Sequence, residues 1–282
     1  MNSVALFQCL QPHVTATTLR QCRRIADAIL VMTGRVTMLG LSRWAGTGGS
    51  YRTVQRFFST VIPWATLFWV FFRQHVYCPE DVYLLVGDEV VATKAGKHTH
   101  GLDRFFSSLY GKPVPALAFF TLSLVSTQQR RSFPIRVEQV VRSDAAKAAR
   151  KAKADAKKSS SSLPKRRPGR PKGSKNTATS AVTLTPEVSR ITGMLGALLH
   201  MIAGVVSLTY VVLDGHFGHH NALAMAQQHN LHLISKLRCD AALSFPYAGP
   251  YAGRGPRRKY GDKVDDDNIP AQYLKATTVE GH

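Results

Sequence analysis

Apolar side chains in the first 78 residues recur at helical spacing. They lie three or four positions apart over residues 17–34 and again over residues 36–44, which predicts two helices. Ser50 is a good N-cap for a third helix over residues 51–60, and the glycine-rich residues 45–49 must turn the chain before it. Two helices joined by a turn are the order of helix-turn-helix DNA-binding modules. An ordinary helical hairpin with a solvated basic face is the alternative.

Between residues 79 and 142 the helical spacing gives way to short runs of β-branched and aromatic residues. Such runs are typical of buried strands, and three in succession predict an antiparallel meander. Farther along the chain the pattern alternates between helix and strand. The strand-like runs lie at residues 82–88, 116–125 and 133–141, followed by a helix from Thr185, a strand over 205–213, a helix over 220–229 and a strand over 231–237.

Two of the strand-like runs end on an aspartate. Asp88 follows Val82–Gly87, and Asp214 follows Thr209–Leu213. Because an unpaired buried charge is costly, two buried strands that each present a carboxylate favour a metal site over a stabilising role. The alternative for either residue alone is that it starts a turn, as aspartate often does. Glu89 should point to the opposite face of the strand, so we do not count it as a ligand.

The charge of the chain predicts a polyanionic partner. The 282 residues include 37 Lys and Arg against 17 Asp and Glu, a formal net charge of +20. Such an excess favours nucleic acid first and an anionic membrane second. Half of the charge lies in residues 143–176, where twelve Lys and Arg against two Asp give +10. A segment of this composition cannot pack a core, so we expect residues 143–180 to be a disordered basic linker.

The centre of that linker, Gly169–Pro171, resembles an AT-hook. A narrow, extended arginine segment fits the minor groove of A·T-rich DNA, where the electrostatic potential is most negative. Pro168 stands where that motif usually has an arginine. The alternative is a generic basic linker that binds phosphates without sequence preference.

Cysteines, histidines and apolar stretches exclude several other classes. The four cysteines lack zinc-ligand spacing and suggest no disulfide framework, which fits a reducing cytoplasm. His98 and His100 are expected in a solvated loop. The N-terminus does not have the pattern of a signal peptide. Residues 191–213 are long enough to span a membrane, but they change from helix-like to strand-like, so we read a buried helix that leads into a buried strand. A small membrane protein remains an alternative hypothesis for the chain.

The order of elements and a few short motifs carry a family resemblance. Gly87–Lys94, Lys97–Phe105 and Leu213–Phe217 resemble the corresponding segments of DDE transposases of bacterial insertion sequences, within the DDE superfamily endonucleases. The resemblance extends over about residues 20 to 282. It implies an α/β fold, a ribonuclease H-like mixed sheet with helices. This fold would follow an all-helical DNA-binding region and be interrupted by the basic linker.

The same resemblance implies a metal-dependent site. Asp88 and Asp214 would be its first two acids and would bind two divalent ions, Mg²⁺ or Mn²⁺, for DNA strand cleavage and strand transfer. The third acid of the family is a glutamate on a later helix with Tyr, Arg and Lys. Neither Asp265–Asp267 nor Glu280 has that context. We therefore expect a C-terminally truncated chain that shows little or no cleavage by itself.

We expect four regions and one macromolecular partner, double-stranded DNA at the transposon ends and the target. Residues 1–78 are expected to bind DNA, 79–142 and 181–282 to form the two parts of an incomplete catalytic domain, and 143–180 to link them. A homodimer in the DNA complex, no membrane contact and a bacterial cytoplasmic, nucleoid-associated location complete the expectation. The alternative function is DNA binding without catalysis, as in an inactive relic. The DNA-binding candidates are Arg52, Gln55, Arg56, Lys94, Lys97, Arg166, Arg167, Arg170, Lys172, Arg254, Arg257, Arg258 and Lys259.

Overall fold

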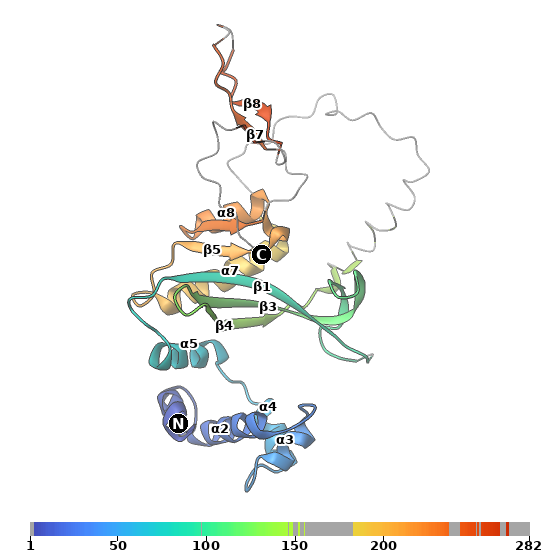
Figure 1. Cartoon of the computed structure of the whole chain (residues 1–282). Coiled ribbons are helices and arrows are strands. Elements are labelled where there is room, and N and C mark those ends of the chain that lie inside the picture. The colour runs from blue at the N-terminus through green and yellow to red at the C-terminus, as the bar shows by residue number, and fades with distance from the viewer. Residues whose placement is uncertain are drawn as a thin grey trace. The chain divides into compact units, whose positions relative to one another are not determined.

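The computed structural model in Figure 1 describes most of the chain outside the basic linker and the C-terminal end. The chain forms two compact units, residues 1–235 and residues 236–282. The described residues are 3–96, 98–145, 147–148, 152, 155, 183–236, 243–251, 253, 255–265 and 269–270.

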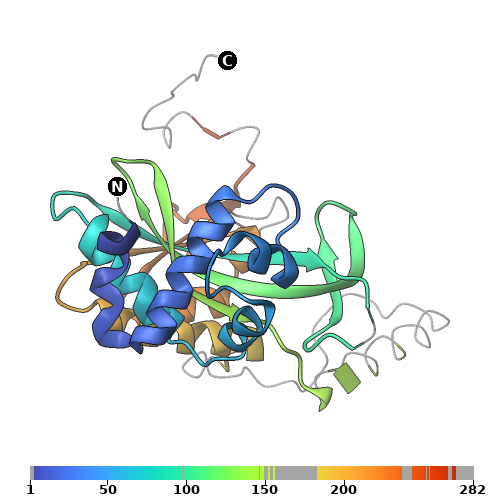
Figure 2. The same ribbon diagram turned by 90° about the horizontal axis from the view of Figure 1, so that it is seen from below.

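Helices make up the first part of the larger unit (Figures 1 and 2). Three of them pack around a small apolar core that includes Ile25, Leu41 and Phe57. Thr37 and Ser50 cap the second and third helices of this group, each by accepting a hydrogen bond from a backbone N–H three residues ahead. The helices are α1 (Ser3–Phe7), η1 (Gln8–His13), α2 (Ala16–Val31), α3 (Met38–Trp44), α4 (Tyr51–Phe58) and α5 (Trp64–His75).

A six-stranded mixed sheet follows the helices. Its order is β2-β3-β1-β5-β6, and β4 pairs with β3 beside β2. Strand β3 is antiparallel to β1, β2 and β4, whereas β1, β5 and β6 are mutually parallel where they pair. The strands are β1 (Tyr83–Thr93), β2 (Asp103–Ser107), β3 (Lys112–Ser126), β4 (Arg131–Gln139), β5 (Tyr210–Leu213) and β6 (His232–Ser235).

Helices α7 (Pro186–Ile202) and α8 (His220–Gln228) bury one face of this sheet. Thr185 accepts a hydrogen bond from Val188 N, and Pro186 occupies the first helical turn, where its missing N–H costs nothing. The buried stripe of α7 packs against alternate residues of β1, β3 and β5. None of the helices in the described residues is both long and apolar enough to cross a membrane.

Three sequence-based expectations need correction. The strand predicted to end at Asp88 continues to Thr93, because β3 pairs with it over its whole length. The strand predicted over residues 205–213 is confined to 210–213, since Val205 and Val206 instead donate their N–H groups to Ile202 O at the end of α7. The meander of three strands contains a further strand, β2, in a stretch for which no element was predicted.

The smaller unit is described only in part. It contains an antiparallel pair, β7 (Ser244–Pro246) and β8 (Tyr260–Lys263), within a stretch rich in glycine, proline and tyrosine. Arg257 and Arg258 lie over the rings of Tyr251 and Tyr247, with 5.7 and 5.1 Å between guanidinium carbon and ring centroid.

Candidate active site

Asp88 and Asp214 occupy neighbouring positions on two parallel strands. Gly87 of β1 is paired with Leu213 of β5, so the aspartate after each residue lies one step farther along both strands. Asp214 has an extended backbone (φ −64°, ψ 172°), which continues the alternation of β5. Gly87 and Leu213 are buried, whereas both aspartates are exposed. The two carboxylates therefore leave the same face of the sheet from strands about 4.8 Å apart.

The residue before Asp88 has to be small. A Cβ atom on Gly87 would lie 2.6 Å from Leu213 Cδ2 and 2.9 Å from Phe120 Cζ, and both of those side chains are buried. Close approach of β5 to β1 at the acid pair thus depends on the absence of a side chain.

Both aspartates are held by local hydrogen bonds. Asp88 Oδ1 accepts from Glu89 N at 2.8 Å. The backbone oxygen of Asp214 accepts from Ser235 Oγ at 2.7 Å and from Phe217 N at 3.0 Å, which ties the end of β5 to β6 and to the following turn η3 (Gly215–Phe217). The backbone of the site is therefore fixed while carboxylate oxygens face outward.

The pair is chemically suited to a hard divalent cation. Carboxylate oxygens are the donors that Mg²⁺ and Mn²⁺ prefer. Within the described residues, neither aspartate forms an ion pair with Lys or Arg that would compete with a metal. The same part of the chain has no group of three or more His, Cys, Asp or Glu positioned to hold an ion. Asp88 and Asp214 would thus supply two ligands.

Glu89 lies on the opposite face, as alternation along β1 requires. It is half-buried beside α7, near Glu187 and Arg190. Burial, together with the negative charge of Glu187, raises the pKa of Glu89 above its usual value of 4.5, while Arg190, Arg142 and His216 act in the other direction. His216 Nε2 is 3.7 Å from Glu187 Oε2. Sequence reasoning missed this polar cluster, because only the packing of α7 on β1 brings it together.

The DNA-binding candidates of the N-terminal helices share one exposed face. Arg52, Gln55 and Arg56 are exposed on α4, while Val54 and Phe57 of the same helix are buried against α2 and α3. Ser50 Oγ accepts from Thr53 N at 3.4 Å and so caps this helix. Helix α3, a turn and α4 occur in the order of a helix-turn-helix, with the three polar side chains free of the core.

The other DNA-binding candidates are dispersed. Lys94 is exposed at the end of β1, and Lys259 is exposed in the smaller unit near Arg257 and Arg258. His98 and His100 are exposed. Six DNA-binding candidates lie outside the described residues: Lys97, Arg166, Arg167, Arg170, Lys172 and Arg254. Most of the basic linker and the acids Asp266, Asp267 and Glu280 also lie outside them.

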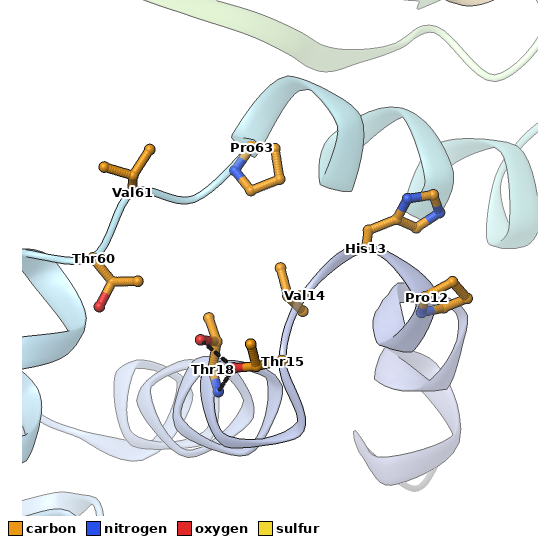
Figure 3. Close-up of a pocket in the computed structure, with 8 residues that line it drawn as sticks. All are labelled: Pro12, His13, Val14, Thr15, Thr18, Thr60, Val61 and Pro63. Atoms are coloured by element: carbon orange, nitrogen blue, oxygen red, sulfur yellow. Dashed lines mark hydrogen bonds between the residues drawn. The ribbon is translucent and has the colours of Figure 1, made fainter.

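A hollow among the N-terminal helices contains none of these residues. Figure 3 shows it between the start of α2 and the segment that joins α4 to α5. Thr15 caps α2 here by accepting from Thr18 N at 3.2 Å. His13 is the one ionisable residue in its lining, which otherwise consists of prolines, valines and threonines. This hollow therefore lacks the donors of a metal site.

The fold defined by these elements is ribonuclease H-like: a mixed sheet whose first and central strand β1 is flanked by antiparallel β3 and parallel β5, with helices between the later strands. The chain belongs to the DDE superfamily endonucleases, whose family model matches residues 6–280. No curated protein matches it. Among solved structures it is similar to a chain of the Drosophila P element transposase strand transfer complex. The identity is 11%, the TM-score 0.33, and the match covers 82% of this chain but 43% of that chain.

Proposed function

We propose that this chain is a transposase of the insertion-sequence type, in which Asp88 and Asp214 bind Mg²⁺ or Mn²⁺ for DNA strand cleavage and strand transfer. The observation that carries the proposal is the parallel pairing of β1 with β5, which sets both carboxylates on one sheet face. Membership of the DDE superfamily endonucleases supports it, because enzymes of that superfamily use divalent metal ions.

The residues around the pair have defined roles in this proposal. Asp88 and Asp214 provide the negative charge and the hard oxygen donors. The N–H of Glu89 orients the carboxylate of Asp88, and the hydroxyl of Ser235 fixes the backbone at Asp214. When bound, a pair of divalent ions supplies activation of the attacking oxygen and stabilisation of the leaving oxygen of a phosphodiester.

DNA binding is the second part of the proposal. In this proposal Arg52, Gln55 and Arg56 contact the element end, as residues of a recognition helix do in a helix-turn-helix, and their exposure on α4 supports it. The formal charge of +20 provides sequence-independent attraction to the phosphate backbone.

Iron-directed cleavage of the polypeptide tests the metal site without requiring nuclease activity. Fe²⁺ in place of Mg²⁺, with peroxide and ascorbate, produces radicals that cut the chain next to the bound ion. We expect cuts near residues 88 and 214 that excess Mg²⁺ or Mn²⁺ suppresses. Asp88→Asn and Asp214→Asn should each abolish the cuts at both places, since one ion would join the two strands.

Asp144→Asn is the matched control, because Asp144 has an almost fully exposed carboxylate outside the sheet. It should leave the cuts unchanged. Plasmid nicking in Mg²⁺ or Mn²⁺ gives a second readout: either site variant should remove any nicking seen with the parent chain while DNA affinity is kept. Unchanged cuts in the site variants, or no cuts in the parent, would instead favour DNA binding without catalysis.

A further inference from the structure

The hairpin between β2 and β3 exposes large apolar side chains at its tip. Phe106 is 63% exposed, Leu109 83% and Tyr110 53%. We call residues 106–112 the hairpin tip. Three large apolar side chains gathered at one exposed turn are unusual unless they contact a partner.

The tip is carried by an arm, which consists of β2 and the adjoining ends of β1 and β3. This arm has a small apolar core of its own. Phe105 is buried with Ala116 and Ala118, and Val114 and Val91 pack against them. Figures 1 and 2 show β2 and the ends of β1 and β3 extending past the other strands.

Arg142 fixes β2 at the base of the arm by contacts with three of its residues. Its guanidinium lies 4.2 Å from the ring centroid of Phe105 and 3.1 Å from Asp103 Oδ2, and it also donates to Arg104 O at 3.0 Å. Three contacts from one residue hold β2 in place, so the tip projects from a stiff support.

The β1-facing edge of β3 beyond the end of β1 is unsuited to pairing with a strand of another protein. Lys94 N donates a hydrogen bond to Pro115 O, so the backbone polar groups of Pro115 point toward the β1 side of β3. Pro113 and Pro115 have no N–H on that side, and β1 ends before it can cover Pro113. Prolines at such an edge block the addition of a further strand.

The charge of the arm favours a polyanion. Lys94, Arg104 and Lys112 are exposed. The acid Asp103 is neutralised by its ion pair with Arg142 at 3.1 Å. Apolar side chains flanked by cations match a DNA groove, where apolar residues pack on sugars and base steps while cations contact phosphates.

The distance from the acid pair fits a duplex running along the sheet. Asp88 is paired with Thr121 of β3, nine residues from Lys112, the last residue of the tip. Nine residues of antiparallel strand span about 30 Å. That length corresponds to about nine base pairs of duplex at 3.4 Å each.

We propose that the hairpin tip grips duplex DNA up to about nine base pairs from the phosphodiester at the acid pair. Leu109 and Tyr110 pack into a groove, and Lys112 contacts the backbone. The inference rests on the proposed function, because it takes the bound polymer to be DNA.

Affinity for a 40-base-pair duplex of mixed sequence, measured by fluorescence anisotropy in EDTA, tests the tip separately from metal chemistry. Leu109→Asp should raise Kd about tenfold, since it replaces a groove contact by a negative charge. Val82→Asp is the matched control: Val82 is 61% exposed before β1, at the opposite end of that strand from the arm. It adds the same charge and should change Kd far less. Equal changes in the two variants would overturn the proposal.

Photo-crosslinking identifies the partner directly. Tyr110→Cys carrying an azidophenacyl group should crosslink to the duplex, above the background of the parent chain with its native cysteines. Crosslinks to a second copy of the protein in place of DNA would make the tip a subunit contact and overturn the inference. A parent chain without affinity for the duplex would overturn the proposed function as well. Affinity that is unaffected by Leu109→Asp would overturn the inference alone.

Discussion

Gly87 is the residue on which the spacing of the two acids depends. Any side chain there would press on Leu213 and Phe120, both of which are buried and closely packed. Because buried side chains are close-packed and have little room to move, the strain would displace the end of β5, and Asp214 with it.

Gly87→Ala should therefore lower the free energy of unfolding by about 1–3 kcal/mol, the usual cost of overpacking. It should also weaken the iron-directed cuts at residues 88 and 214. Denaturant unfolding measures the first effect. Gly193→Ala is the control, since Gly193 is exposed in the middle of α7 with open space around its Cβ position. That change should stabilise by about 0.5–1 kcal/mol. Equal stability of the two variants would contradict the packing argument.

Glu89 makes stability depend on pH. Its pKa in the folded chain is raised above 4.5 by burial and by Glu187, so the folded state holds this proton more tightly than the unfolded state. The associated stability is present below pH 4.5 and is lost as pH rises through the raised pKa.

Glu89→Gln removes this titration. Relative to the parent, the variant should gain in unfolding temperature as pH rises from 4.5 to 7, measured by thermal denaturation at several pH values. Glu80→Gln, a change at an exposed glutamate before β1, provides the baseline. A difference between variant and parent that stays constant over this pH range would show that Glu89 is not held in the way the structure indicates.

At the scale of elements, α4 combines a buried and an exposed face in only eight residues. Val54 and Phe57 anchor it to α2 and α3, which leaves Arg52 and Arg56 exposed to solvent. A short helix with such an anchor can present its polar side chains rigidly.

Changing Arg52 and Arg56 together to Ala should weaken binding to the element end more than binding to random DNA, because base contacts specify sequence while phosphate contacts do not. Competition gel shifts with both duplexes measure the ratio. Arg131→Ala removes an exposed arginine at the start of β4 and serves as the control. An equal loss on both duplexes would mean that α4 contacts phosphates only.

At the scale of the whole molecule, the formal charge is unevenly distributed along the chain. Residues 143–176 contribute +10 of the formal +20. Attraction of such a segment to DNA arises from the release of counterions, so its strength falls steeply with salt.

Deleting residues 145–175 should flatten the dependence of log affinity on log salt concentration, since each phosphate contact contributes about 0.9 to the slope. Anisotropy titrations between 50 and 200 mM salt, about the range over which this effect is large, measure it. The double variant of Arg52 and Arg56 provides a comparison in which fewer cations are lost. An unchanged slope after the deletion would rule out the linker as the main nonspecific contact.

Local patterns were sufficient for much of the fold. The caps at Ser50 and Thr185 and the apolar periodicity of α2 and α7 depend on residues close in sequence, so α2, α4 and α7 were predictable to within a few positions. The ribonuclease H-like order followed from the succession of strands and helices together with the family resemblance. The strand β2 escaped prediction because Asp103–Ser107 is short and is stabilised by its pairing with β3 rather than by its own composition.

The sequence by itself determined most of the elements, the basic character of the chain and two aspartates, Asp88 and Asp214, as candidate ligands. Tertiary structure decided that those two aspartates lie next to each other. Asp88 and Asp214 are 126 positions apart, and only the parallel register of β1 with β5 makes them neighbours. Glu89 likewise meets Glu187 and Arg190 only where α7 packs on β1. Contacts between distant segments depend on strand register and helix packing, which local residue patterns do not encode.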